Sequence, residues 1–244
     1  MTPGMASATW TRATACSPVK VTLTTPGIDA AGQTAAHGIP APVVAAYLDG
    51  LRIEVEKTGD YTLLVLFSIG TTTGKWGSLL DGLLSFKRAY DQGQLVAEAI
   101  PDLAAAWPGR YDGVTLRELC DQMHAEIRGR RISGLLDRAF GDLPAPAATP
   151  ADAYRHLVRG RTERVPVTAM AGRTAAVMVV RYPPGIPVLM PGEQAGASDG
   201  PVLQYLLALQ ALDTQFPGFA HDIHGVERDD HGTFSIECLH QEGG

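Results

Sequence analysis

The first third of the chain combines short β-branched segments with two helical patterns. We expect strands at Val19–Thr25, Ile53–Lys57 and Leu63–Ile69, and helices at Pro40–Leu48 and Thr73–Tyr90. The third strand is almost continuously apolar, which is typical of a strand buried on both faces. In the longer helix the apolar residues recur at helical spacing. The order strand–helix–strand–strand–helix predicts a small α/β layer.

A helical region and then a linker follow this layer. From Leu95 to Phe140 the pattern is almost wholly helical, and Thr115 with Glu118 matches a capping box. Leu143–Pro150 contains three prolines and shows no periodicity. We therefore place a domain boundary at this segment.

Beyond the linker, the pattern predicts a compact α+β domain. Helices are expected at Ala151–Val158 and Pro201–Phe216, the second of them amphipathic. Strands at Ala175–Val180 and Val188–Met190 flank a proline-rich turn, and Ile223–Leu239 is typical of a hairpin.

Composition excludes several classes of protein. Of the 244 residues 45% are hydrophobic and 19% charged, which is enough apolar material for a core. The net charge of -6 argues against a surface for nucleic acid or anionic membrane. No apolar run approaches the roughly 20 residues of a membrane span, and the N-terminus has no secretory pattern. Three widely spaced cysteines fit neither a disulfide framework nor a zinc site. We expect a soluble, cytoplasmic protein.

Two short motifs do not carry the chemistry that they suggest. Gly70–Trp76 has three residues between its glycines where a P-loop has four, and tryptophan stands where the magnesium-binding Ser/Thr belongs. His221 and His224 lie three residues apart in a turn without a nearby third ligand. We predict no nucleotide site, and no metal site, from these motifs.

Several spaced motifs resemble one enzyme family. They are Lys20–Ile28 (KVTLTTPGI), Ile53–Gly70 (IEVEKTGDYTLLVLFSIG), Tyr182–Glu193 (YPPGIPVLMPGE) and Phe216–Gly225 (FPGFAHDIHG). Together they resemble the C-terminal portion of the bacterial Orn/Lys/Arg decarboxylases, which depend on pyridoxal 5'-phosphate (PLP) and have the aspartate-aminotransferase fold type. The resemblance runs over nearly the whole chain.

The resemblance implies a fold class and a division of the chain. Residues 1–15 are unmatched, and residues 16–142 correspond to an α/β small-domain segment that closes the PLP-binding module of a fold-type I enzyme. A linker at 143–150 then leads to the compact α+β C-terminal domain of the family at 151–244.

The same resemblance implies that the cofactor's lysine lies elsewhere. PLP chemistry needs a Schiff-base lysine and an aspartate paired with the pyridinium nitrogen. In the family this lysine lies in a Ser-x-His-Lys motif, whereas none of the four lysines here follows a histidine. We therefore expect this chain to be inactive alone, and we assign it no catalytic, cofactor-binding or metal-ligating residue.

Two residues are candidate substrate contacts. By the resemblance, Glu56 takes the position of a glutamate that reaches the distal nitrogen of the substrate. A glutamate paired with Lys57 or solvated is the alternative, and Glu54 shares its face if the segment is a strand. Tyr182 lines the active-site entrance or a dimer contact, or it packs the turn.

Three other polar residues are expected to be structural. Glu193 at the end of the Pro-Gly-Glu turn is expected to make a cap or backbone hydrogen bond, and His221 to support the hairpin. His124 is interpreted as a helix-surface or satisfied core histidine.

The complete enzyme would convert arginine, lysine or ornithine to the amine and CO2. Its implied partners are a PLP-binding large domain or a full-length homologue, and a homo-oligomer is expected. Two other functions stay open: a non-catalytic binding or regulatory protein that associates with a full-length decarboxylase, and one half of a split enzyme.

Overall fold

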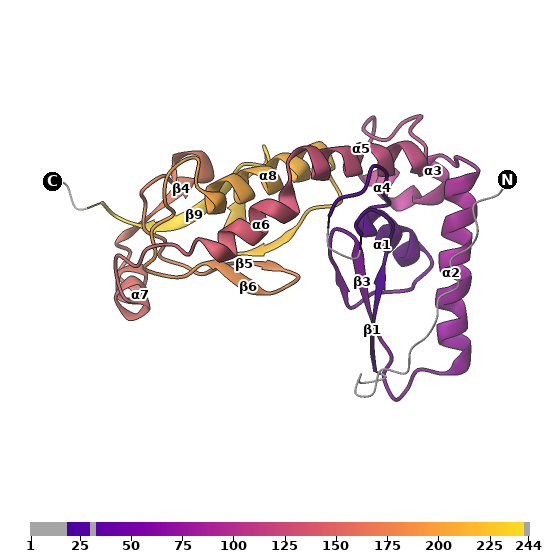
Figure 1. Cartoon of the computed structure of the whole chain (residues 1–244), viewed down its shortest axis with the longest axis horizontal. Helices are drawn as coiled ribbons and strands as arrows, with labels where there is room; N and C mark the ends of the chain where they lie inside the picture. Colours follow the sequence, from indigo (N-terminus) through magenta and orange to yellow (C-terminus); the bar gives the residue numbers. More distant parts are fainter. Residues whose placement is uncertain (1–18, 30–32, 242–244) are drawn as a thin grey trace.

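The computed structural model describes residues 19–29 and 33–241 as an elongated arrangement, with the N-terminal elements at one end and the C-terminal elements at the other (Figure 1). The N-terminal elements are β1 (Lys20–Thr24), α1 (Ala41–Gly50), β2 (Lys57–Thr58), β3 (Thr62–Leu66) and α2 (Thr73–Asp91). The strands form an antiparallel sheet in the order β1-β3-β2. The predicted small α/β layer is therefore present.

Two expectations about this sheet were wrong. The strand expected at Ile53–Lys57 is reduced to the two residues of β2. The chain leaves α1 through a left-handed residue, Arg52 (φ 60°), and this segment joins the sheet only at Lys57. β3 is not buried on both faces: Leu63 and Val65 are buried while Leu66 is exposed. An antiparallel sheet commonly keeps one face towards solvent, and β3 follows that rule.

Helix α2 stands at the outer edge of the molecule and buries only part of its apolar surface (Figure 1). Leu79 and Phe86 face the core. Trp76, Leu80 and Leu84, spaced four residues apart, are 46–52% exposed. The helix thus carries an apolar stripe that no other described element covers.

Four helices connect the two ends: α3 (Val96–Ala99), α4 (Pro101–Ala106), α5 (Leu116–Gly129) and α6 (Ile132–Gly141). The capping box is confirmed, since the Thr115 hydroxyl accepts from the Glu118 backbone N–H and the Glu118 carboxylate accepts from the Thr115 N–H. His124 on α5 is buried, with ring nitrogens 2.6 Å from the Tyr61 hydroxyl and 3.1 Å from the Ala35 carbonyl oxygen. It is a satisfied core histidine.

The C-terminal elements form two three-stranded antiparallel sheets with two helices. They are α7 (Pro150–Val158), β4 (Thr162–Pro166), a 3-10 turn (Val167–Ala169), β5 (Val179–Tyr182), β6 (Ile186–Leu189), α8 (Pro201–Gln215), β7 (Asp222–His224), β8 (Val226–Arg228) and β9 (Phe234–Leu239). The sheet orders are β4-β9-β8 and β6-β5-β7.

The expected hairpin is confirmed for β8 and β9, but β7 pairs with β5 in the other sheet. The chain changes sheet at Gly225, where φ is 80° and a Cβ would lie 2.0 Å from the Met178 carbonyl oxygen. The strand expected at Ala175–Val180 was placed too early, because Ala175 makes only an isolated bridge to Cys238.

Helix α8 is not amphipathic as expected. It is buried nearly all round, with only Gln204, Thr214 and Gln215 classed as exposed, because α6, the 3-10 turn and β9 surround it. Helix α6 precedes the expected linker and α8 follows it, so the contact between the two helices joins both sides of the linker. The backbone N–H groups of Ala147 and Ala148 in the linker also donate to the Gly192 carbonyl oxygen. The domain division at 143–150 stays a prediction.

The described residues contain no helix that is long and apolar enough to cross a membrane. Cys120 and Cys238 are buried free thiols, and Cys16 lies outside the described residues.

Candidate functional site

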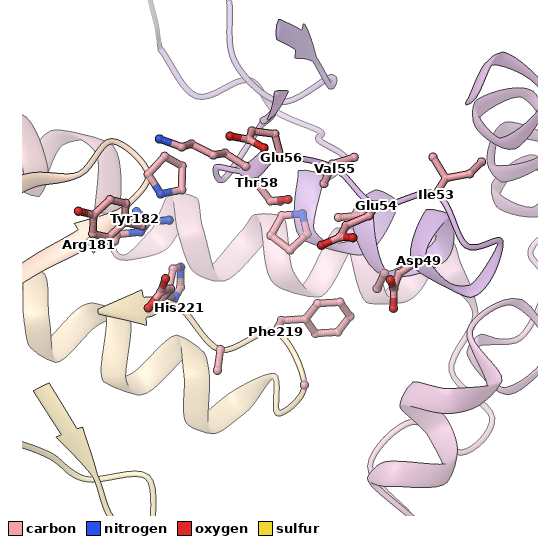
Figure 2. Close-up of a pocket in the computed structure, with 18 of the residues that line it drawn as sticks. Asp49, Ile53, Glu54, Val55, Glu56, Thr58, Arg181, Tyr182, Phe219 and His221 are labelled. Carbon is pink, nitrogen blue, oxygen red and sulfur yellow. The ribbon is translucent and has the colours of Figure 1, made fainter. Parts of the chain in front are cut away.

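A cavity of about 800 Å³ lies between the N-terminal and C-terminal elements (Figure 2). One wall is formed by α1 and the extended segment at residues 53–58. The other wall is formed by residues 181–183 and by the segment at 218–224 that leads into and includes β7. The cavity is therefore built from segments more than a hundred residues apart in the sequence.

The N-terminal wall owes its course to the end of α1. After the left-handed turn at Arg52, the chain runs along the cavity, and the Glu56 N–H donates to the Leu64 carbonyl oxygen of β3 at 2.8 Å. Glu54 and Glu56 both line the cavity although their segment is not a strand. Figure 2 shows the carboxyl groups of Asp49 and Glu54 directed to the space above Phe219, with Glu56 farther along the same segment.

The carboxylates of this wall lack internal partners. The side chains of Asp49, Glu54 and Glu56 are exposed and make no hydrogen bond or ion pair with other residues in the described part of the chain. On the opposite wall, the one ion-pair contact of the Asp222 carboxylate among the described residues is with His224 Nε2, at 3.4 Å. Unpaired carboxylates around one cavity favour a cationic ligand.

The C-terminal wall contributes aromatic surface. Tyr182 is 40% exposed, and its ring centre lies 5.0 Å from that of His224 and 5.9 Å from the Lys57 ammonium nitrogen. Lys57 contacts Tyr182 and makes no ion pair with Glu56 among the described residues. The predicted residues Glu56 and Tyr182 thus line the same cavity, and their role as substrate contacts stays a prediction.

A buried ion pair lies beneath these walls. Arg181 donates to a carboxylate oxygen of Asp60 at 2.5 Å and to the Tyr205 hydroxyl at 3.0 Å. Burial alone would raise the pKa of Asp60, but Arg181 and His221 outweigh it and hold that pKa well below its usual range. Burial lowers the pKa of Arg181, and Asp60 with Tyr205 more than restores it, so the guanidinium stays charged.

His221 is fixed by a second buried carboxylate. Its Nδ1 contacts Asp213, and its backbone N–H donates to both oxygens of that carboxylate at 3.2 Å. Arg228 donates to Asp213 at 2.5 Å. Since a carboxylate only accepts, Nδ1 carries the proton and Nε2 faces Asp60 at 3.9 Å. The interpretation of His221 as structural fits these contacts.

Sequence reasoning missed Asp60, Arg181 and Asp213. A signal was available for Arg181, because a single arginine ends the apolar run at 175–180, and a charge in such a run usually has a buried partner. Glu193 was interpreted correctly, since its carboxylate accepts from the Met190 backbone N–H at 2.7 Å.

The residues of this chain do not fit PLP by themselves. Lys57, the lysine of the cavity, is exposed and lies over the Tyr182 ring, while Lys87 pairs with Asp91 on the outer helix α2. Neither faces a buried aspartate that would hold a pyridinium nitrogen. The described residues also contain no group of three or more side chains suited to a metal ion.

Two models of one protein family match the chain. The model described as "Orn/Lys/Arg decarboxylase, C-terminal domain" matches residues 133–240, and "Orn/Lys/Arg decarboxylase, major domain" matches residues 9–75. The two regions flank the cavity, with one wall from each.

Lysine and arginine decarboxylases also match about nine tenths of this chain. Lysine decarboxylase LdcA of Pseudomonas aeruginosa is 44% identical, with 91% of this chain and 30% of the relative covered. The biodegradative arginine decarboxylase of Escherichia coli is 37% identical over 91% of this chain and 29% of its own length. The structure of the E. coli constitutive lysine decarboxylase matches with a TM-score of 0.86 at 42% identity, covering 92% of this chain and 32% of that one. The chain belongs to the Orn/Lys/Arg decarboxylase family, and it spans about 30% of the length of these relatives.

Proposed function

We propose that this chain is the C-terminal part of a PLP-dependent decarboxylase of a basic amino acid, and that its cavity binds the distal cation of the substrate. The observation that supports this most is the set of unpaired carboxylates in a cavity between the two regions that match the family. A distal ammonium or guanidinium group would satisfy charges that the described residues leave without partners.

Lysine is the first substrate to test. LdcA of P. aeruginosa, a lysine decarboxylase, is 44% identical to this chain, compared with 37% for the arginine decarboxylase of E. coli. Glu56 is the proposed contact to the distal nitrogen, with Glu54 as the neighbour that could replace it. Tyr182 is proposed to cover the apolar stem of the substrate from the other wall.

Catalysis also needs the PLP-binding part of the family, which lies outside the region of the relatives that these residues match. When bound by that part, PLP supplies the electron sink for loss of CO2. The residues described here would bind and orient the substrate and exclude water from one side of it. A PLP-binding large domain or a full-length homologue is therefore the proposed partner, and the chain alone is proposed to be inactive.

The test is a fusion in which this chain replaces the matching C-terminal part of P. aeruginosa LdcA. We expect lysine decarboxylation by the fusion and none by the isolated chain. Glu56→Gln should raise KM for lysine, and Asp91→Asn on α2, far from the cavity, serves as the charge-matched control. A folded, PLP-loaded fusion without decarboxylase activity towards lysine, arginine or ornithine would contradict the proposal.

The second candidate is a non-catalytic binding or regulatory protein that associates with a full-length decarboxylase; one half of a split enzyme is a separate, third candidate. None of the four lysines in this sequence follows a histidine, the position that the resemblance implies for the Schiff-base lysine of the family. A chain that binds a full-length homologue and changes its activity, while the fusion stays inactive, would support the second candidate.

A further inference from the structure

One buried contact joins the two walls of the cavity. Asp60 follows Glu56 by four residues, and Arg181 directly precedes Tyr182. The Arg181 Nη2–H donates to Asp60 Oδ1 at 2.5 Å, and the two side chains are only 7% and 14% exposed. The residues proposed to contact the substrate from either side are thus tied together through their chain neighbours.

Arg181 depends on Asp60 for its charge compensation. Its Nη1–H donates to the Tyr205 hydroxyl at 3.0 Å, and its buried Nε–H has no partner among the described residues. In the described part of the chain, Asp60 is the one carboxylate within ion-pair distance of this guanidinium. Without Asp60, a buried cation would keep only one neutral acceptor, which is strongly unfavourable.

Asp60 also fixes the start of α1. Its backbone carbonyl oxygen accepts from the Ala41 N–H at 2.8 Å, and α1 forms part of the same cavity wall through Pro42 and Ala45. On the other wall, His221 is anchored to Asp213 and holds its Nε2 3.9 Å from the Asp60 carboxylate. Asp60 therefore touches both walls, whereas none of the unpaired carboxylates does.

We propose that Asp60 and Arg181 are positioning residues whose ion pair sets the separation of the carboxylate wall and the aromatic wall, and so the affinity of the cavity for a basic amino acid. The choice of ligand rests on the proposed function. With the pair intact, a cation reaches carboxylates while its stem lies against Tyr182. With the pair broken, the exposed contact between Lys57 and the Tyr182 ring still joins the walls. Their separation then has no buried ion pair to hold it, and the affinity for the ligand falls.

The experiment compares Asp60→Asn, Arg181→Gln and the double variant in the full 244-residue chain. Glu163→Gln is the matched control, because it breaks an ion pair to Arg173, whose side chain is 13% exposed, away from the cavity. The dissociation constant of L-lysine is measured by chemical-shift titration, which reports on the folded fraction alone. Amide hydrogen exchange is followed at residues 53–58 and 218–222 without ligand.

We expect each single variant to weaken L-lysine binding at least about tenfold, the factor that corresponds to 1.4 kcal/mol. The double variant should bind no worse than either single variant, because the pair acts as a unit. Exchange should rise on both walls in these variants and stay unchanged in Glu163→Gln. A pair that only stabilises the fold would lower the unfolding temperature and leave the dissociation constant as it was.

The outcomes separate the two proposals. Binding by the wild type that survives unchanged in the variants, or faster exchange on one wall only, overturns the positioning role and leaves the proposed function standing. No L-lysine binding by the wild type, together with an inactive fusion, overturns the cation site and the positioning role with it. No L-lysine binding together with unaltered exchange overturns the positioning role even if the fusion is active.

Discussion

The Tyr61–His124 hydrogen bond gives a sharp test of how the helical region is held to the sheet. Both residues are 3% exposed, and the Tyr61 oxygen lies 2.6 Å from His124 Nδ1. The Ala35 carbonyl oxygen, 3.1 Å from Nε2, only accepts, so Nε2 carries the proton and Nδ1 must accept from Tyr61. Burial and the neighbouring Asp60 raise the pKa of Tyr61, so its hydroxyl remains a donor.

Tyr61→Phe removes this donor and leaves Nδ1 buried without a partner. A buried acceptor that loses its partner costs about 1–3 kcal/mol of stability. For a chain of this length each kcal/mol corresponds to about 2–4 °C in Tm. We therefore expect a clear fall in both the free energy of unfolding and Tm.

The assay is urea unfolding of wild type, Tyr61→Phe and Tyr47→Phe, followed by circular dichroism. Tyr47 is the control because its ring is partly buried and packs against the core, edge-on to Phe86 at 5.4 Å, while its hydroxyl makes no hydrogen bond within the described residues. Equal losses in the two variants would refute the reasoning, because the loss would then come from the phenol oxygen in general and not from His124.

Three further predictions follow from the same structure. The pKa of folded Asp60 lies below the 3.8 of an ordinary aspartate, so the stability that its carboxylate gives the fold is complete above about pH 4 and is lost as the pH falls further. Acid unfolding of Asp60→Asn, followed by fluorescence, should lack this part of the pH dependence. Burial raises the pKa of Cys120 to about 12 and that of Cys238 to about 11, so mass spectrometry should find both unmodified by a thiol reagent at neutral pH until denaturant is added; fast labelling would contradict this. Replacing exposed Leu80 and Leu84 by glutamine should reduce self-association of the chain in sedimentation with little change in Tm, because the α2 stripe would lose its apolar contacts.

Local signals in the sequence predicted most of the helices. The α2 period and the Thr115 capping box act within a few residues, so tertiary contacts do not change them. The errors arose where distant partners decide. Burial of α8 on most sides depends on α6 and β9, and β7 leaves the expected hairpin because Gly225 lets the chain turn into another sheet.

The candidate site was predictable only in part. The resemblance pointed to Glu56 and Tyr182, and both line the cavity. The pair beneath them joins residues 121 positions apart, and no local period or short motif brings Asp60 to Arg181. Sequence alone therefore indicated side chains at the surface of the cavity but not the contact that holds its walls.

The charge balance of the cavity bears on the choice between a binding site and a merely packed interface. Asp60 and Asp213 are buried, and each is matched by an arginine, as folding demands of buried charge. Asp49, Glu54 and Glu56 line one wall and make no ion pair with any described residue, because Lys57 of the same cavity lies against the Tyr182 ring instead. Like charges on one wall repel each other. A structural interface gains from pairing or replacing such groups, whereas a site for a cationic ligand needs them free. The buried carboxylates are paired with arginines, whereas the exposed carboxylates of the cavity wall have no ion pair. This difference favours binding of a basic ligand.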